Sequence, residues 1–408
     1  MRPSLSLRPP VVLAAALVFA GLSPRDAAAQ FVRTVVVSPR PTPLGSGLRL
    51  LRALARITTA GPGRPYLVKI EPGIYDLGTA SLAMKPYVDV EGSGEGVTRV
   101  ISSVDTTATI VGAANSALRH LTVENDGANQ AIALRNDAAP FTASHVTCVA
   151  TGGALGATGI ANNSTDPAVT FEHVTARAGG ADSAVGISSR GGLMRSVHAR
   201  VSASDLAYAV FNSGSDGELV DVVAEAESGR FAGGIRNESG GPTLRNVRAF
   251  AKGADIGDGI VNGGATRARI FGAVIHAIGG PSFASGIRNE FATALISQAD
   301  ITAEADSSAF GVSCILGGRI TLVDVTVRAT SAGNGIGVLA DDGTVTTIDR
   351  SSVGGDGFSV ATGFGPTASR VDVGASRLEG PVRPGAGTIN CVVSYDANLV
   401  HLDPACMP

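Results

Sequence analysis

A four-residue phrase recurs about every 25 residues through most of this 408-residue chain. Its first copy, Gly-Ile-Ala-Asn, begins at Gly159, and the step between aliphatic residues varies from 23 residues (Ile187 to Val210) to 27 (Ile160 to Ile187). Later copies begin at Gly186, Ala209, Gly234, Gly259, Gly286 and Gly311. A fixed period in this range is typical of stacked supersecondary units, none of which can bury its apolar face alone.

A second phrase, out of phase with the first, alternates apolar with polar residues. Copies begin at His120, His145 and His173. Alternation of this kind predicts a β-strand with one buried face, and Gly-rich connectors such as Gly179-Gly180 predict turns. Each repeat therefore holds two or three short strands. We predict an all-β fold, a right-handed parallel β-helix (solenoid) of roughly a dozen coils with a short N-terminal capping helix.

Two other repeat architectures compete with this one. Left-handed β-helices need a hexapeptide period, which is absent, and leucine-rich repeats need several leucines per unit, which the chain does not provide. The absence of Trp and an aromatic content of only 4% suit a narrow solenoid core filled with aliphatic residues, Ala and Thr.

The two ends of a β-helix need covering, because they expose sheet edges and core. We expect residues 30–64 to form an N-terminal cap with a short helix from Leu48 to Ile57, residues 65–378 to form the β-helix, and residues 379–408 to form an irregular C-terminal cap. The helix has an expected apolar face of Leu48, Leu51, Leu54 and Ala55, opposite Arg49, Arg52 and Arg56.

Residues 1–29 have the features of a bacterial secretory signal peptide. Arg2 and Arg8 precede an apolar run that is too short to span a membrane, and a small-residue site predicts cleavage after Ala29. We therefore expect a secreted or periplasmic protein without a membrane span. Cleavage removes three arginines and one aspartate and moves the net charge from −3 to −5. With no basic run, nucleic acid is not an expected partner.

Four cysteines and a set of asparagines have structural interpretations. Cys148 and Cys314 should be buried free thiols, too far apart to bond, whereas Cys391 and Cys406 are candidates for a disulfide that closes the terminal loop. In the recurring phrase the aliphatic residue and the Asn share one side of the strand. Stacked amides can hydrogen-bond between coils, so we predict a structural ladder of Asn162, Asn212, Asn237, Asn262 and Asn289.

Three stretches within residues 65–150 carry short motifs: YLVKIEPGIY at 66–75, DVEGSG at 89–94, and VENDG with QAIALR within 123–135. These stretches resemble pectin methylesterases. Residues 66–75 and 89–94 are similar to that family's first strand and turns, and residues 123–135 resemble the segment with its first active-site glutamine, here Gln130. The resemblance implies a pectin-lyase-like fold. The family's Gln-Asp-Thr, Asp-Phe-Ile-Phe-Gly-like and Leu-Gly-Arg-Pro-Trp-like motifs, which carry two catalytic aspartates, an arginine and a tryptophan, are absent.

Ester hydrolysis of that type needs a carboxylate nucleophile beside a second carboxylate, so Gln130 alone could only help to hold an oxyanion. We therefore expect no pectinesterase activity and no cofactor. Asp341 and Asp342 resemble the paired aspartates of polygalacturonases, but that family's other motifs are absent and a solvated turn is expected.

His120, His145 and His173 hold one register in three consecutive coils. They should face outward as a row spaced about 4.8 Å apart. Together with Gln130 they are the candidate ligand-binding residues. Such a row can bind a metal or a sugar, but a straight row suits tetrahedral zinc poorly, so we predict no metal site.

The sequence favours an exported, non-catalytic solenoid that acts as a surface, matrix or glycan-binding protein, with a polysaccharide or cell-surface glycan as its partner. Two alternatives stay open. One is a divergent carbohydrate-active enzyme of the pectinesterase or polysaccharide-lyase type, and the other is a protein-interaction scaffold. The sequence leaves the ligand and the oligomeric state open.

Overall fold

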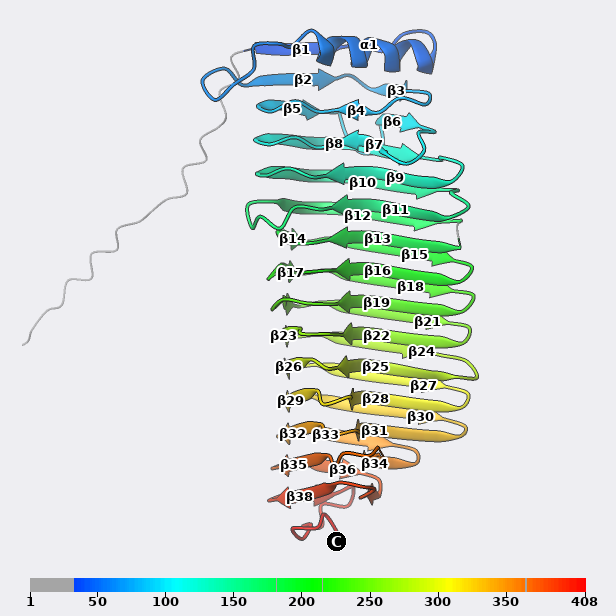
Figure 1. Ribbon diagram of the computed structural model, residues 1–408, viewed down its shortest axis with the longest axis vertical. Helices are drawn as coiled ribbons and strands as arrows, with labels where there is room; N and C mark the ends of the chain where they lie inside the picture. Colours follow the sequence, from blue (N-terminus) through cyan, green and yellow to red (C-terminus); the bar gives the residue numbers. More distant parts are fainter. Residues whose placement is uncertain (1–32, 181, 215, 364) are drawn as a thin grey trace, which may run out of the picture. The chain divides into compact units, whose positions relative to one another are not determined.

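A computed structural model describes residues 33–408 apart from 181, 215 and 364. In these residues the chain winds through successive coils, and each strand pairs in parallel with the matching strand of the next coil (Figure 1). The expected parallel β-helix of pectin-lyase-like architecture is confirmed, and its handedness stays a prediction. The expected signal peptide lies outside the described residues.

One sheet of 13 strands contains the recurring phrase. Its strands are β4 (Leu82–Ala83), β7 (Ala108–Val111), β9 (Gln130–Asn136), β11 (Gly156–Asn162), β13 (Ser183–Ser189), β16 (Leu206–Asn212), β19 (Phe231–Asn237), β22 (Ile256–Asn262), β25 (Phe283–Glu290), β28 (Ser308–Ile315), β31 (Asn334–Ala340), β34 (Phe358–Thr362) and β37 (Val382–Arg383).

A second sheet of 26 strands forms the rest of the wall. Its first half contains β1 (Arg33–Val37), β2 (Tyr66–Ile70), β3 (Gly73–Asp76), β5 (Val88–Glu91), β6 (Thr98–Ser102), β8 (Ser116–Asn125), β10 (Phe141–Thr151), β12 (Thr170–Gly179), β14 (Leu193–Arg195), β15 (His198–Ala203), β17 (Glu218–Val220), β18 (Val223–Ser228) and β20 (Thr243–Arg245). Its second half contains β21 (Arg248–Gly253), β23 (Arg267–Phe271), β24 (Val274–Ile278), β26 (Thr293–Ser297), β27 (Asp300–Ala305), β29 (Arg319–Val323), β30 (Thr326–Ser331), β32 (Val345–Asp349), β33 (Ser352–Gly355), β35 (Arg370–Gly374), β36 (Arg377–Glu379), β38 (Thr388–Val392) and β39 (Tyr395–Asp396).

The phrase glycines allow the coils to stack closely. A Cβ at Gly286 would lie 2.5 Å from the carbonyl oxygen of Gly311 and 2.4 Å from the Ile301 side chain. The aliphatic residue that follows points into the core, where Ile260 and Ile287 pair in register and are fully buried. Stacking of one phrase on the next thus fills the core with identical side chains.

A column of residues with left-handed backbone turns the chain at one corner of every coil from His120 onward. Parallel register aligns these residues one above another. Their φ angles lie between 45° and 64°, and the column contains His120, His145, His173, Ser196, Asp221, Asn246, Gly272, Gln298, Asp324, Arg350, Ala375 and Val393. The side chain before the turn and the side chain after it therefore belong to two different walls of the coil.

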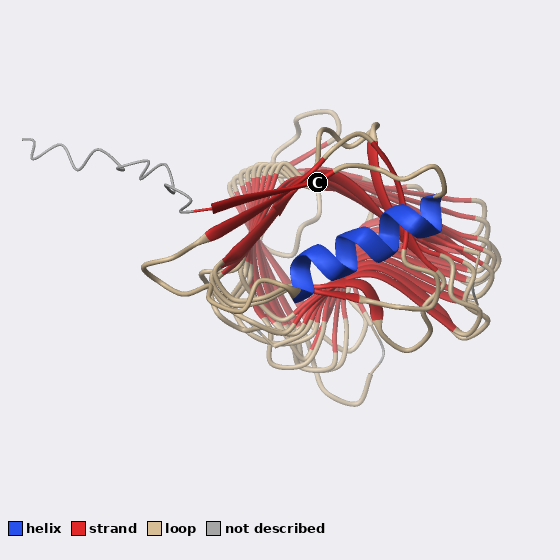
Figure 2. Cartoon of the chain, turned by 90° about the horizontal axis from the view of Figure 1, so that it is seen from above, coloured by secondary structure: helices blue, strands red, loops and turns tan. Residues whose placement is uncertain are grey.

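Helix α1 spans Pro43–Ala55, with Thr42 as its N-cap, and packs against β3 near the first coil (Figure 2). The buried side of the helix differs from the expected apolar face. It carries Gly47, Leu50 and Leu54, whereas Leu48 is exposed. Gly47 sets this orientation, since a Cβ there would lie 1.8 Å from the Asp76 carbonyl oxygen of β3.

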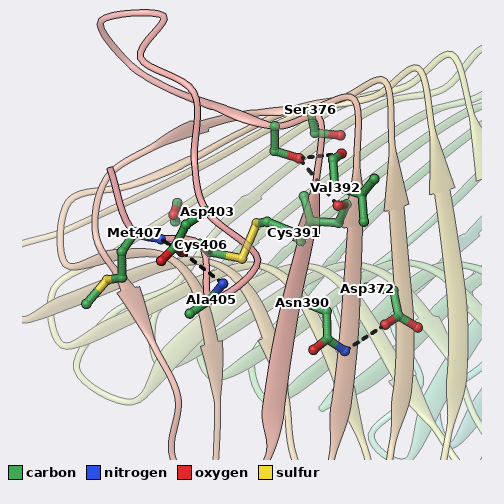
Figure 3. The surroundings of a disulfide bond; sticks show 12 residues. Asp372, Ser376, Asn390, Cys391, Val392, Asp403, Ala405, Cys406 and Met407 are labelled. Carbon is green, nitrogen blue, oxygen red and sulfur yellow. Dashed lines mark hydrogen bonds between the residues drawn. A yellow bond between two sulfur atoms is a disulfide. The ribbon is translucent and has the colours of Figure 1, made fainter.

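The parallel pairing reaches beyond both expected limits of the solenoid. At the N-terminus, β1 pairs with β2, so residues 33–37 form a strand of the second sheet. At the C-terminus, β38 and β39 pair with β35 and β36. The last residues fold back on this coil, where Cys391 and Cys406 are joined by a disulfide (Figure 3).

Candidate functional site

The five asparagines of the predicted ladder all lie inside the solenoid and are buried. The Nδ2 of Asn212 donates to Asn237 Oδ1, and that of Asn237 donates to Asn262 Oδ1, each at 2.9 Å. Asn162 accepts from Asn136 at 2.9 Å, an earlier member of the ladder that the phrase pattern did not include. These bonds are internal, so the amides of Asn212, Asn237 and Asn262 have a structural role.

The ladder is not continuous over all five residues. Asn162 donates to Ser189 in the next coil. Asn289 donates to the Ala292 carbonyl oxygen. Within the residues that the structure describes, no bond joins Asn262 to Asn289.

The three candidate histidines form an outward row at the left-handed corner. Ring centroids are 4.9 Å apart from His120 to His145 and again from His145 to His173. The ring of His120 is half-buried and the other two are exposed. In the described part of the chain, no three His, Cys, Asp or Glu side chains are grouped so that they could hold a metal ion.

Gln130 and the Asp341–Asp342 pair do not join the histidine row. Gln130 is an exposed residue at the start of β9, in the other sheet. Asp341 accepts hydrogen bonds from the backbone N–H groups of Asp342 and Gly365. Its carboxylate therefore stabilises a turn between coils. No helix of residues 33–408, where described, is long and apolar enough to cross a membrane.

The outer face of the 13-stranded sheet carries a feature that sequence reasoning missed. Parallel register aligns Tyr208, Gly233, Asp258, Ser285 and Phe310 in one column. On either side lie half-buried rings and guanidinium groups from the same strands, namely Phe211, Phe231, Arg236, Phe283 and Arg288. We call these ten residues the outer-face cluster.

Asp258 lies at the centre of the outer-face cluster and is fully buried. Its Oδ2 lies 3.1 Å from Arg288 Nη2. Burial raises the pKa of the Asp258 carboxyl to about 6, and the neighbouring Arg288 cation opposes this rise. On the outside of the solenoid, the Asp258 carboxylate thus lies next to the Ser285 hydroxyl and the Arg288 guanidinium. An ordinary surface ion pair is exposed to solvent, whereas this carboxylate is buried and has a raised pKa, as is typical of functional sites.

The cluster repeats one arrangement two coils apart. Arg236 donates to Tyr208 Oη at 2.7 Å, lies over its ring and pairs with Glu238 at 2.9 Å. Arg288 likewise lies 5.7 Å from the centroid of Phe283 and 3.3 Å from Glu290.

These arginines are held by an aromatic face on one side and a carboxylate on the other. Each side chain is only partly buried, at 29% and 17% exposed for Arg236 and Arg288 respectively. Their guanidinium groups are therefore oriented but still reach the surface.

Further along the same face, a cavity of about 330 Å³ adjoins the cluster at Phe310. Its lining includes Ile336 and Leu339 of β31, together with Asp341 and Arg383. Arg383 lies 5.3 Å from the centroid of the Phe358 ring, which repeats the pairing of a guanidinium with an aromatic face. The face thus combines aromatic rings, arginines and carboxylates over several coils.

No protein-family model and no curated protein matches the chain. Among solved structures it is similar to the A-module of mannuronan C-5 epimerase AlgE4 from Azotobacter vinelandii, at 12% identity and a TM-score of 0.43, covering 88% of this chain and 99% of that one. It is also similar to the catalytic domain of a GH87 α-1,3-glucanase in complex with nigerose, at 14% identity and a TM-score of 0.41, covering 87% and 66%.

A third similar structure is the Dettilon tailspike protein, at 12% identity and a TM-score of 0.44, covering 76% of this chain and 66% of that one. At these identities and TM-scores, the three structures say nothing about the activity or the ligand of this chain.

Proposed function

We propose that this protein is an exported, non-catalytic β-solenoid that binds an extended polysaccharide along the outer face of its 13-stranded sheet. The observation that supports this proposal is the outer-face cluster, with half-buried rings beside oriented guanidinium and carboxylate groups. Sugar rings offer apolar C–H faces and hydroxyl groups, so they need both kinds of contact. Coils about 4.8 Å apart repeat these contacts in a line, which suits an extended chain.

The absence of catalysis is part of the proposal. Hydrolysis of a glycosidic or an ester bond by two carboxylates needs both carboxylates within reach of the substrate. Asp258 is fully buried beneath its neighbours, and Glu238 and Glu290 are occupied by Arg236 and Arg288. These contacts favour a binding face over a reaction centre.

A glycan array probed with the mature protein, followed by calorimetry on the best ligand, tests the proposal. Replacing Phe231 and Phe283 by Ala should weaken binding at least tenfold, since truncating a central aromatic contact typically costs more than about 1 kcal/mol. Phe291→Ala is the matched control, because this ring is 63% exposed and follows β25 outside the cluster. Equal affinities of the double variant and the wild type would refute the proposed face.

The competing functions give different results in the same assays. Release of reducing ends, unsaturated sugars or methanol from a bound glycan would indicate an enzyme. A face that binds no glycan but retains a protein partner through Phe231 and Phe283 would indicate an interaction scaffold.

We also propose the finer features that the fold leaves open. The solenoid is right-handed, and α1 caps its first coil, as supported by the packing of α1 against β3. Residues 1–29 direct export and are removed after Ala29. N-terminal sequencing of exported protein should therefore begin at Gln30, and a different first residue would overturn the proposed cleavage site.

A further inference from the structure

A groove of about 760 Å³ lies between α1 and β1, near the first coil. Among the described residues, five arginines and no carboxylate line it; the arginines are Arg33, Arg40, Arg49, Arg52 and Arg56. Within the described residues, none of the five takes part in an ion pair. A concave site with charges of one sign concentrates its field on the space between the walls.

One wall of this groove is a strand with a free edge. In the part of the chain that the structure describes, β1 pairs with β2 alone. All five residues of β1 line the groove, from both faces of the strand, so the groove follows the strand's edge. An unpaired edge presents alternating N–H and C=O groups that can pair with another extended chain.

The opposite wall comes from α1 and its C-cap residue, Arg56. Arg49, Arg52 and Arg56 follow one another at helical spacing, and Arg49 also donates to the Ser38 carbonyl oxygen at 3.3 Å, just beyond β1. The positive field reaches the groove floor. There, the pKa of Tyr66 is lowered first by its hydrogen bond with Thr59 and further by Arg33 and Arg64.

We propose that this groove binds an extended acidic peptide segment, which adds a strand to the free edge of β1 and places alternate carboxylates against the arginines of α1. Strand addition supplies main-chain hydrogen bonds, and guanidinium–carboxylate pairs supply charge-assisted ones. A polysaccharide can match the charges but has no N–H and C=O pattern for the strand edge. A membrane surface cannot follow a strand edge inside a groove.

The first experiment uses a fluorescent acetyl-Glu-Val-Glu-Val-Glu-Val-amide peptide and the mature full-length protein. We expect saturable binding by anisotropy that weakens as salt is raised, and no binding of the counterpart with Lys in place of Glu. Arg52→Gln with Arg56→Gln should weaken binding at least tenfold. The matched control replaces Arg267 and Arg269 by Gln. These two exposed arginines belong to β23 in another coil, so the affinity of this variant for the peptide should stay within twofold of wild type.

The second experiment tests the strand edge. Two peptides are N-methylated, one at the odd and one at the even positions. Because only alternate residues of an added strand direct N–H groups at β1, one peptide should keep its affinity and the other should lose at least tenfold. Equal binding of both would reduce the groove to a nonspecific anion site and overturn strand addition.

Competing ligands complete the test. Polygalacturonate, or vesicles of phosphatidylglycerol, that bound more tightly than the peptide and displaced it would overturn the proposal in favour of a glycan or a lipid surface. The Phe231→Ala, Phe283→Ala variant should bind the peptide as the wild type does. Failure of the peptide site and failure of the outer glycan-binding face are thus distinguishable.

Discussion

Asp258 Oδ2 and Arg288 Nη2 lie 3.1 Å apart on the outer face of the 13-stranded sheet, and the aspartate is fully buried while the arginine is 17% exposed. The two residues belong to neighbouring coils and are 30 positions apart in sequence. Burial makes the charged carboxylate costly, and the arginine offsets only part of that cost. We therefore expect the stability of the protein to depend on pH through this pair.

The stability of the protein should fall between pH 4 and pH 6 because of Asp258. Its pKa is raised from 3.8 to about 6, so in this window the native state holds a proton that the unfolded chain has released. The free energy of unfolding therefore decreases as pH rises, by about 3 kcal/mol in total. Asp258→Asn removes this titration.

Urea unfolding of wild type and Asp258→Asn at several pH values measures the effect. The variant should gain stability relative to wild type as pH rises through this window. A stability difference that stays constant from pH 4 to pH 7 would contradict the assignment of the pH sensitivity to this group.

Asn237→Ala should destabilise the solenoid by about 2–5 kcal/mol, because it leaves the Asn212 donor and the Asn262 acceptor buried without partners. Urea unfolding followed by circular dichroism checks this value. Asn163→Ala, at an exposed neighbour of the ladder that binds Asp137, is the matched control and should cost less than about 1 kcal/mol. Equal losses in the two variants would argue against a stabilising ladder.

Gly286→Ala should cost roughly 1–3 kcal/mol or more, because the added methyl group meets the Gly311 carbonyl oxygen and the Ile301 side chain. Gly63→Ala provides the comparison, since a Cβ at that position has no atom within 4 Å. The shift in thermal midpoint of each variant measures the effect. Tolerance of Ala at Gly286 would mean that the coils can separate at little cost.

The disulfide between Cys391 and Cys406 should stabilise the C-terminal coil. Their separation of 15 residues corresponds to about 3 kcal/mol of loop-closure entropy. Replacing both by Ser should raise hydrogen exchange in β38 and β39 and leave β19 and β22 protected. Thiol labelling of unfolded, unreduced protein should detect Cys148 and Cys314 alone, and four labelled cysteines would show that the bond does not form.

Much of the fold could be predicted because the signals are local. A phrase of fixed period, with apolar and polar residues alternating inside it, indicates which side chains of a strand point inward. The Asn237 and Asn262 amides lie inside and the histidine row lies outside, as this alternation predicts. At the N-terminal end the predicted helix face was wrong, because α1 turns a different face to the core where Gly47 permits close contact with β3.

The candidate sites needed information that no single repeat contains. Arg236 and Arg288 occupy the variable position of the phrase, and Asp258 precedes a phrase glycine, so each resembles an ordinary surface residue when its own copy is read alone. The signal available in the sequence was the Asp itself, at a position that is Thr, Val, Tyr or Gly in the four earlier copies.

The sequence by itself determined the repeat, the strands and the side of each strand that faces the core, because side-chain alternation acts within a few residues. Only the tertiary structure decided which outward residues meet. The register between coils decides which outward side chains lie next to one another. This register cannot be read from one repeat, because the number of residues per coil varies. The free edge of β1 is likewise decided by the tertiary structure. The other edge of β1 pairs with β2, where Arg33 lies opposite Tyr66, 33 positions further along the chain.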